Sequence, residues 1–116
     1  MKLPNAENAV IDIEKLRDYS LNPNHPEGKH KARVFLEKLG MGRNDAERLR
    51  QQILEEILRA EATEQKPTVY GRRFVVDFPI RVDARFELVL SWVTIRSAWI
   101  IRNEEDFARL TTCFIP

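Results

Sequence analysis

The chain has 116 residues, of which 43% are hydrophobic and 32% charged, and its formal net charge is +1. These values are typical of one globular domain and exclude an intrinsically disordered chain. The near-neutral charge gives no overall attraction to nucleic acid. The single cysteine excludes an intramolecular disulfide and a multi-cysteine zinc site.

No apolar run approaches the roughly 18 residues of a membrane span, and the N-terminal residues lack the apolar core of a secretory signal. We therefore expect a single cytoplasmic domain over residues 1–116 that does not contact a membrane. The two histidines have no supporting cysteines or carboxylates at metal-ligand spacing, so we predict no metal and no cofactor. Cys113 is expected to be a buried structural thiol on a late strand.

Apolar residues recur at the spacing of one helix face in three segments of the first half. The three segments are 13–20, 29–39 and 45–61. Asp12 and Asn44 are placed to cap the first and the third, and Glu47 completes a box-like pair with Asn44. Gly40 is suited to end the second. The loop 22–28, which is rich in proline and asparagine, separates the first two segments.

After Pro67 apolar residues alternate with polar ones, which indicates strands with one buried face. The expected strands are 74–80, 86–102 (either one long bent strand or two) and 108–115. Trp92 and Trp99 are expected in the core, and Arg96 and Arg102 fall on the face opposite Trp99. This order predicts an α+β fold, with about three N-terminal helices packed on a C-terminal antiparallel sheet of three to four strands.

The segment from Gly28 to Arg33 opens the second predicted helix and is strongly basic. Free backbone N–H groups and the helix dipole favour an anion at such a start, and cationic side chains there oppose the dipole unless an anion is bound. Lys29, Lys31 and Arg33 are therefore candidate phosphate ligands, and His30 is a candidate for proton transfer. The alternative is that these side chains are solvated on the polar face of the helix.

Arginines form a second candidate cluster on the later strands. Arg96, Arg102 and Arg109 are expected to face one groove, with either Thr111 or Thr112 on the same side. Guanidinium groups match the geometry of phosphate. The alternative is that these arginines pair with carboxylates on neighbouring segments. The available carboxylates are Asp77, Glu87 and Asp106.

Three stretches of the chain resemble a bacterial domain of unknown function. They are 19–26 with 28–35, then 70–74, and then 98–102 with 109–112. Similar domains occur as short free-standing proteins and at the C-terminal tips of bacterial polymorphic toxins, where the tip is usually the toxic enzyme. By architecture the chain is also similar to the Barnase–EndoU–colicin–RelE class of small ribonucleases.

These resemblances and the two basic clusters lead to one hypothesis, a metal-independent ribonuclease toxin of a toxin–antitoxin or polymorphic-toxin system. RNA would be the substrate and a small antitoxin the protein partner. In this hypothesis Lys31 and Arg102, together with Lys29, stabilise charge on the phosphate. His30 is the general acid or base, and Thr112 positions the substrate. Phosphate binding would fall to Lys29 as well, together with Arg33, Arg96 and Arg109.

The competing hypothesis is a non-catalytic partner-binding module, such as an antitoxin, immunity or adaptor protein. The near-neutral charge and the absence of a complete catalytic motif favour it. Geometry separates the two hypotheses. A ribonuclease predicts that Lys29 or Lys31 lies within about 8–10 Å of Arg102 or Arg96, a gap that one phosphate and its contacts bridge.

Overall fold

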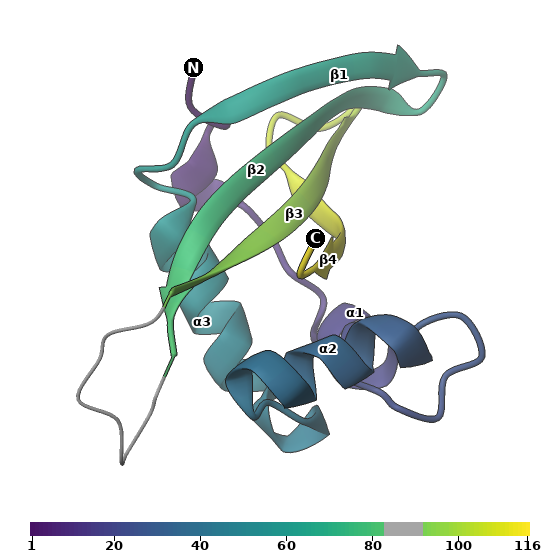
Figure 1. Cartoon of the computed structure of the whole chain (residues 1–116). Coiled ribbons are helices and arrows are strands. Elements are labelled where there is room, and N and C mark those ends of the chain that lie inside the picture. The colour runs from purple at the N-terminus through teal and green to yellow at the C-terminus, as the bar shows by residue number, and fades with distance from the viewer. Residues whose placement is uncertain (83–91) are drawn as a thin grey trace.

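The computed structural model of the chain describes residues 1–82 and 92–116. Helices occupy the first half and strands the second, so the expected α+β fold is confirmed (Figure 1). The helices are α1 (Ile13–Lys15), which continues into the π-helical turn η2 (Leu16–Ser20), α2 (Lys29–Leu39) and α3 (Ala46–Glu56), with short 3-10 turns η1 (Ala6–Asn8) and η3 (Arg43–Asp45). The strands are β1 (Ala62–Thr68), β2 (Gly71–Arg81), β3 (Trp92–Arg102) and β4 (Arg109–Phe114).

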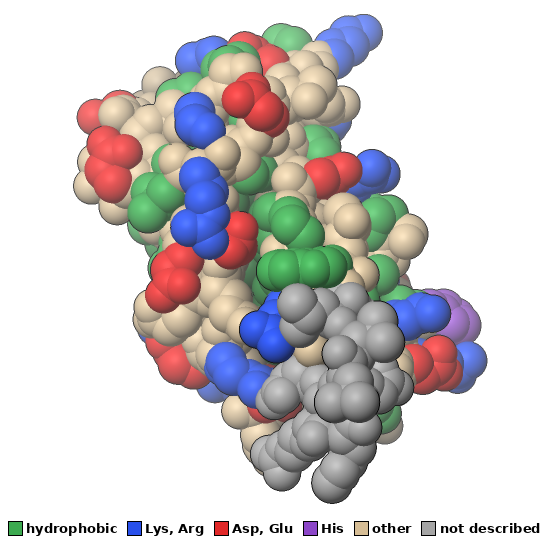
Figure 2. Space-filling model, turned by 60° about the vertical axis from the view of Figure 1, so that its left-hand side comes forward, with side chains coloured by type: hydrophobic (Ala, Val, Ile, Leu, Met, Phe, Trp, Pro, Cys, Tyr) green, Lys and Arg blue, Asp and Glu red, His purple; other side chains and the backbone are tan. Residues whose placement is uncertain are grey.

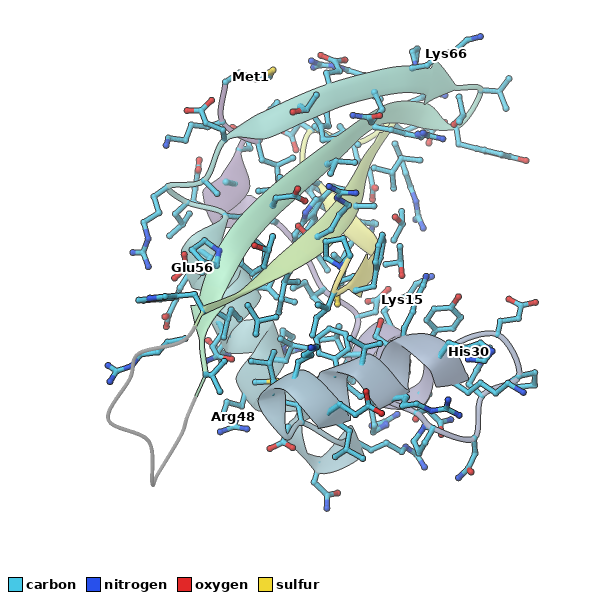
Figure 3. The ribbon with its side chains drawn as sticks, viewed as in Figure 1. Met1, Lys15, His30, Arg48, Glu56 and Lys66 are labelled. Carbon is cyan, nitrogen blue, oxygen red and sulfur yellow. The ribbon has the colours of Figure 1, made fainter. Side chains whose placement is uncertain are left out.

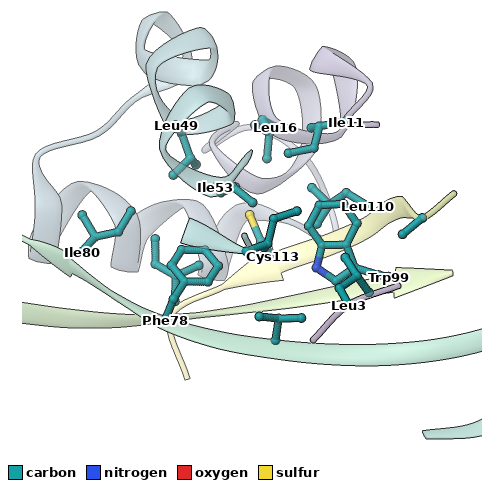
Figure 4. Close-up of a cluster of buried hydrophobic side chains, with 14 of the residues drawn as sticks. Leu3, Ile11, Leu16, Leu49, Ile53, Phe78, Ile80, Trp99, Leu110 and Cys113 are labelled. Atoms are coloured by element: carbon teal, nitrogen blue, oxygen red, sulfur yellow. The ribbon is translucent and has the colours of Figure 1, made fainter. Parts of the chain in front are cut away.

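The described strands form one sheet in the order β1-β2-β3-β4, and each pair of neighbours is antiparallel. Figure 4 shows the helices on one face of this sheet, with the core side chains filling the space between the two layers. Burying this apolar face against the helices is the main stabilising contribution to such a fold. No helix in the described segments combines the length and the apolarity that crossing a bilayer requires.

Trp99 and Cys113 lie in this core, as the sequence predicts. Trp99 is 1% exposed, and its indole N–H donates to Ser97 Oγ over 2.8 Å. The Ser97 hydroxyl donates in turn to the carbonyl of Val76 over 2.7 Å, so the buried polar groups of Trp99 and Ser97 are both satisfied. Cys113 is fully buried, and this burial raises the pKa of its thiol to about 12.

The helix boundaries are confirmed for α2 and corrected for the helix that follows. α2 begins and ends where the sequence predicts, and Gly40 follows it with a left-handed φ of 66°. α3 ends at Glu56 instead of residue 61, because the chain turns there towards β1. Asn44 does not cap it. The box instead joins the backbone N–H of Gly42 to Asp45 Oδ2 over 2.8 Å, at the start of η3.

Two expectations about the sheet are wrong. β1 is absent from the predicted strands because Ala62 alone of its residues is buried, so its sequence shows no alternation. An edge strand tolerates this, and it also tolerates Pro67. Trp92 is 60% exposed at the start of β3 instead of lying in the core. Of the predicted strand 86–102, the part up to residue 91 lies outside the described residues, and the remainder is the single strand β3.

Candidate functional site

The face of the sheet that turns away from the helices carries the candidate site. Strand register places its side chains in rows that cross β2, β3 and β4. The rows are Arg73 with Ile100 and Arg109, Val75 with Ala98 and Thr112, and Asp77 with Arg96 and Phe114. The middle row is small and apolar and ends in a hydroxyl, whereas both flanking rows carry charge. We name this face of the sheet, with the three rows at its centre, the open face.

A β-bulge in β4 brings an additional hydroxyl to the open face. The register shifts between Ala98 and Trp99, because Ala98 pairs with Thr112 whereas Trp99 pairs with Leu110. Thr111 is thus the extra residue, and its hydroxyl donates to the carbonyl of Ala98 over 3.1 Å. Strict alternation predicts that only one of the two threonines lies on this side. The bulge places both there, as bulges near functional sites often do.

Lys31 reaches the open face from the first turn of α2. Its Nζ lies 3.5 Å from Thr112 Oγ1, at the outer limit of a hydrogen bond. The same Nζ lies 5.0 Å from the centre of the Phe114 ring and 5.3 Å from that of Tyr19, both within cation–π range. The side chain is partly buried, and no ion pair among the described residues includes it. A positive charge is therefore held at the sheet edge without a compensating carboxylate from residues 1–82 or 92–116.

Tyr19 contacts Lys31, and His25 packs in turn against Tyr19. The Tyr19 ring packs edge-on against the imidazole of His25, with ring centres 4.7 Å apart. His25 Nδ1 accepts hydrogen bonds from the backbone N–H groups of Glu27 and Gly28, each 3.0 Å long. These bonds shape the loop that leads into α2. His25 therefore has a positioning role that loop composition did not predict.

The other basic residues at the start of α2 do not join Lys31. Residues two apart on a helix are separated by about 200°, so Lys29 points away from Lys31. Lys29 and Arg33 instead line a separate groove of about 240 Å³, together with apolar residues that include Leu36. His30 is exposed, and Figure 3 shows it at the end of α2 that adjoins the 22–28 loop. The predicted cluster is thus divided between different flanks of the helix.

The three arginines predicted on the sheet differ in how far carboxylates compensate them. Arg96 donates to both oxygens of Asp77, each over 3.0 Å, and this pairing raises the pKa of Arg96. Arg109 donates to Glu105 with a shortest distance of 2.7 Å, which raises the pKa of Arg109 and lowers that of Glu105. Arg102 lies 3.9 Å from the same carboxylate, and its side chain is 55% exposed. Arg102 is therefore the least engaged of the three.

Lys31 and the arginines of β3 are related through their neighbours on β4. Lys31 contacts the ring of Phe114, which is the cross-strand partner of Arg96. Arg102 is four residues along β3 from Ala98, the partner of Thr112, which is about 13 Å at the rise of a strand. The backbone positions of Arg102 and Ala98 are therefore well separated along β3.

Arg73 is a site residue that the sequence did not single out. It is exposed on β2 and lines a pocket of about 370 Å³ over the open face, with Gln65, Ile100 and Thr111 among the other lining residues. Cross-strand pairing with Ile100 places Arg73 on the open face. No ion pair of the described residues includes Arg73. Arg73, Arg102 and Lys31 thus give the open face three cations that are free or loosely paired.

The chemistry available here is charge stabilisation and hydrogen bonding. The hydroxyls of Thr111 and Thr112 lie among these cations, next to the apolar row formed by Val75 and Ala98. Within the described ranges no cluster of three potential ligands could hold a metal ion. On the face in Figure 2, acidic and basic side chains are intermixed around an apolar area, in keeping with the net charge of +1. Any anion is therefore bound locally and not by a field over the whole surface.

A family model described as a domain of unknown function, DUF6883, matches residues 2–116. The chain belongs to this family. No curated protein matches it, and no solved structure matches it.

In this DUF6883 domain, the stretches that suggested the resemblance surround the open face. The first contains the end of η2 and the start of α2 with Lys31. The second is the β1–β2 turn with the first residues of β2, including Arg73, and the third comprises the end of β3 and the first residues of β4, including Thr112. The family description names no activity, so function has to be inferred from the site.

Proposed function

We propose that this domain is a metal-independent ribonuclease that binds RNA along the open face. The observation that carries the proposal is the contact of Lys31 with Thr112, a cation and a hydroxyl 3.5 Å apart at the edge of an exposed sheet. Lys31 is partly buried between two aromatic rings and has no carboxylate partner among the described residues. A fixed charge in such surroundings acts more strongly than one in bulk water.

The proposed reaction is attack of a ribose 2′-oxygen on the adjacent phosphorus. The bond from phosphorus to the 5′-oxygen breaks, the proton of the 2′-hydroxyl goes to a base, and the leaving 5′-oxygen takes up a proton. The products are a 2′,3′-cyclic phosphate and a 5′-hydroxyl. Lys31 stabilises the negative phosphorane oxygens, and Thr112 donates a hydrogen bond to them. His30 is exposed one helix position from Lys31, so it serves in proton transfer only to an RNA that extends over the start of α2.

Arginines 73 and 102 hold the neighbouring phosphates in this proposal. Arg73 faces the open face from β2, and Arg102 lies at the far end of β3 with an exposed side chain. Lys29 and Arg33 are excluded from this role because they line a different groove. Arg96 and Arg109 are already paired with carboxylates. The phosphate-binding set therefore differs from the one predicted from the sequence.

The biological role we infer is that of a toxin acting on RNA in the cytoplasm, in a toxin–antitoxin or polymorphic-toxin system. The resemblance to toxin tips and the helices-then-sheet order, which is similar to that of small ribonucleases, support it. Such an enzyme requires a neutralising protein. Covering the open face would be the simplest way for an antitoxin to neutralise it.

The test is incubation of the purified domain with a 5′-labelled single-stranded RNA in EDTA. Cleavage with 2′,3′-cyclic phosphate ends, lost when the same sequence carries 2′-deoxyribose, is the expected result. Induced expression should also arrest growth. RNA that stays intact, with normal growth on expression, would contradict the proposal.

The second candidate function is that of a partner-binding module, and the groove beside α2 favours it. Lys29 and Arg33 form a basic rim over an apolar floor, where Leu36 is 57% exposed. This pattern suits a protein segment with apolar and acidic side chains. Co-expression with the protein encoded by the adjacent gene distinguishes the two functions. A binding module relieves the toxicity of that partner, whereas the proposed ribonuclease is itself neutralised by it.

A further inference from the structure

The β1–β2 turn is fixed to the loop that follows β3. The Asn103 side chain donates to the carbonyl of Val69 over 2.7 Å, and its backbone N–H donates to that of Tyr70 over 3.1 Å. The N–H of Tyr70 donates to Thr68 Oγ1 over 3.2 Å. Gly71 then packs so closely that a Cβ there would lie 2.0 Å from the carbonyl oxygen of Ile101. The turn is held at both ends.

This fixed turn presents two apolar side chains to solvent. Val69 is 83% exposed and Tyr70 is 73% exposed, so neither contributes substantially to the core. Scattered exposed apolar residues are ordinary on a protein surface. An aromatic ring on a fixed backbone differs, because much of the entropy cost of ordering it for a ligand has already been met.

A pocket of about 580 Å³ adjoins this turn, and its lining connects it to the open face. Ile100 and Thr111 line it and also the pocket beside Arg73. Arg102 lines it as well, with its guanidinium Nε 3.9 Å from Glu105. The same carboxylate is only 2.7 Å from Arg109, so the stronger pairing leaves Arg102 free to bind an anion.

We propose that this pocket binds one unpaired base of a single-stranded RNA, stacked on the Tyr70 ring, with an adjoining phosphate on Arg102. Aromatic side chains stack on any base, and arginine beside them engages the backbone. A duplex keeps its bases stacked inside and cannot supply this contact. The identification of the ligand as RNA rests on the proposed function, and the pocket adds the preference for single strands.

The experiment measures binding of a fluorescent single-stranded RNA by anisotropy. The RNA carries 2′-O-methyl groups, so it has no 2′-hydroxyl to attack and stays intact during titration. Tyr70→Ala is expected to raise Kd about 5- to 150-fold, the range for loss of one base-stacking contact. Tyr70→Phe keeps the ring and is expected to bind within about 2-fold of the unaltered chain. A duplex of the same sequence should bind more weakly.

Each outcome separates this inference from the proposed function. If Tyr70→Ala binds as the unaltered chain does, or if Tyr70→Phe loses as much as Tyr70→Ala, base stacking on Tyr70 is overturned. The ribonuclease proposal survives that result if RNA is still cleaved. Equal binding of duplex and single strand also overturns the single-strand preference. If the single strand does not bind at all, both the base pocket and the RNA site fail.

Discussion

Replacing Lys31 by Gln is expected to reduce the rate of RNA cleavage about 100- to 1,000-fold. This is the usual effect of removing one group that stabilises transition-state charge. The structure supports that range because Lys31 has no carboxylate partner among the described residues, so its charge is available to the phosphate. Glutamine retains a polar end but not the charge.

The same substitution should leave the fold intact. Lys31 makes cation–π contacts with the rings of Tyr19 and Phe114 at 5.3 and 5.0 Å, and such contacts contribute about 0.5–1 kcal/mol each at exposed sites. The free energy of unfolding should therefore fall by no more than about 2 kcal/mol. Urea denaturation followed by circular dichroism measures this loss, and initial rates on labelled RNA measure the activity.

Lys29→Gln is the matched control, because it removes the same charge from the same turn of α2. Lys29 lines the other groove, so this variant is expected to cleave RNA within about 3-fold of the unaltered rate, as a change in long-range field alone would allow. The reasoning is refuted if Lys31→Gln keeps full activity while folded. It is equally refuted if the two variants lose activity to the same extent.

Three further predictions concern stability and reactivity. Gly71→Ala should lower the free energy of unfolding by about 2–4 kcal/mol. The reason is that φ of Gly71 is 152° and the new Cβ would lie 2.0 Å from the Ile101 carbonyl oxygen. A urea midpoint equal to that of the unaltered chain would contradict this prediction. The Cys113 thiol, whose burial raises its pKa to about 12, should react with a disulfide reagent at pH 8 only after urea is added, and fast labelling of the native domain would show this to be wrong. Hydrogen bonding from Arg17 lowers the Asp18 pKa from 3.8 to about 2. This depressed pKa stabilises the fold above about pH 4 and ceases to do so as the pH falls towards 2. Between pH 4 and pH 2 the urea midpoint of Asp18→Asn should therefore fall less than that of the unaltered chain.

The elements that the sequence predicts well are those whose burial follows a strict period. α2 has one apolar face, and β2 alternates buried and exposed residues along most of its length. The inward position of Trp99 follows from the same alternation. Trp92 shows the limit of this argument. Its position in β3 is that of an outward residue. The core was expected because Trp92 continues the apolar alternation of Phe86, Leu88 and Leu90, and because tryptophan prefers the interior.

β1 and the bulge in β4 could not be predicted from period alone. β1 gains its backbone hydrogen bonds from β2 and buries little, so its sequence carries charged residues and a proline as edge strands often do. The bulge at Thr111 adds one residue without any glycine or proline to mark it. Both features depend on pairing with distant strands, which local sequence does not encode.

The candidate site was predicted in its residue types and not in its arrangement. The basic start of α2 and the threonines of β4 were identified, but their spacing does not reveal that Lys31 alone meets Thr112. Residues at successive positions of a helix point in different directions, so the basic segment serves two flanks. Arg73 was missed because its place on the open face depends on cross-strand register.

The location of the RNA on the domain is the most direct test of the account. Backbone amide chemical shifts, recorded while a 2′-O-methylated single-stranded RNA is added, report which residues it contacts. We predict that the largest changes fall on the open face and the start of α2, at Arg73, Ile100, Thr111, Thr112 and Lys31. Changes confined to the Lys29 and Arg33 groove, or to α3, would contradict the account.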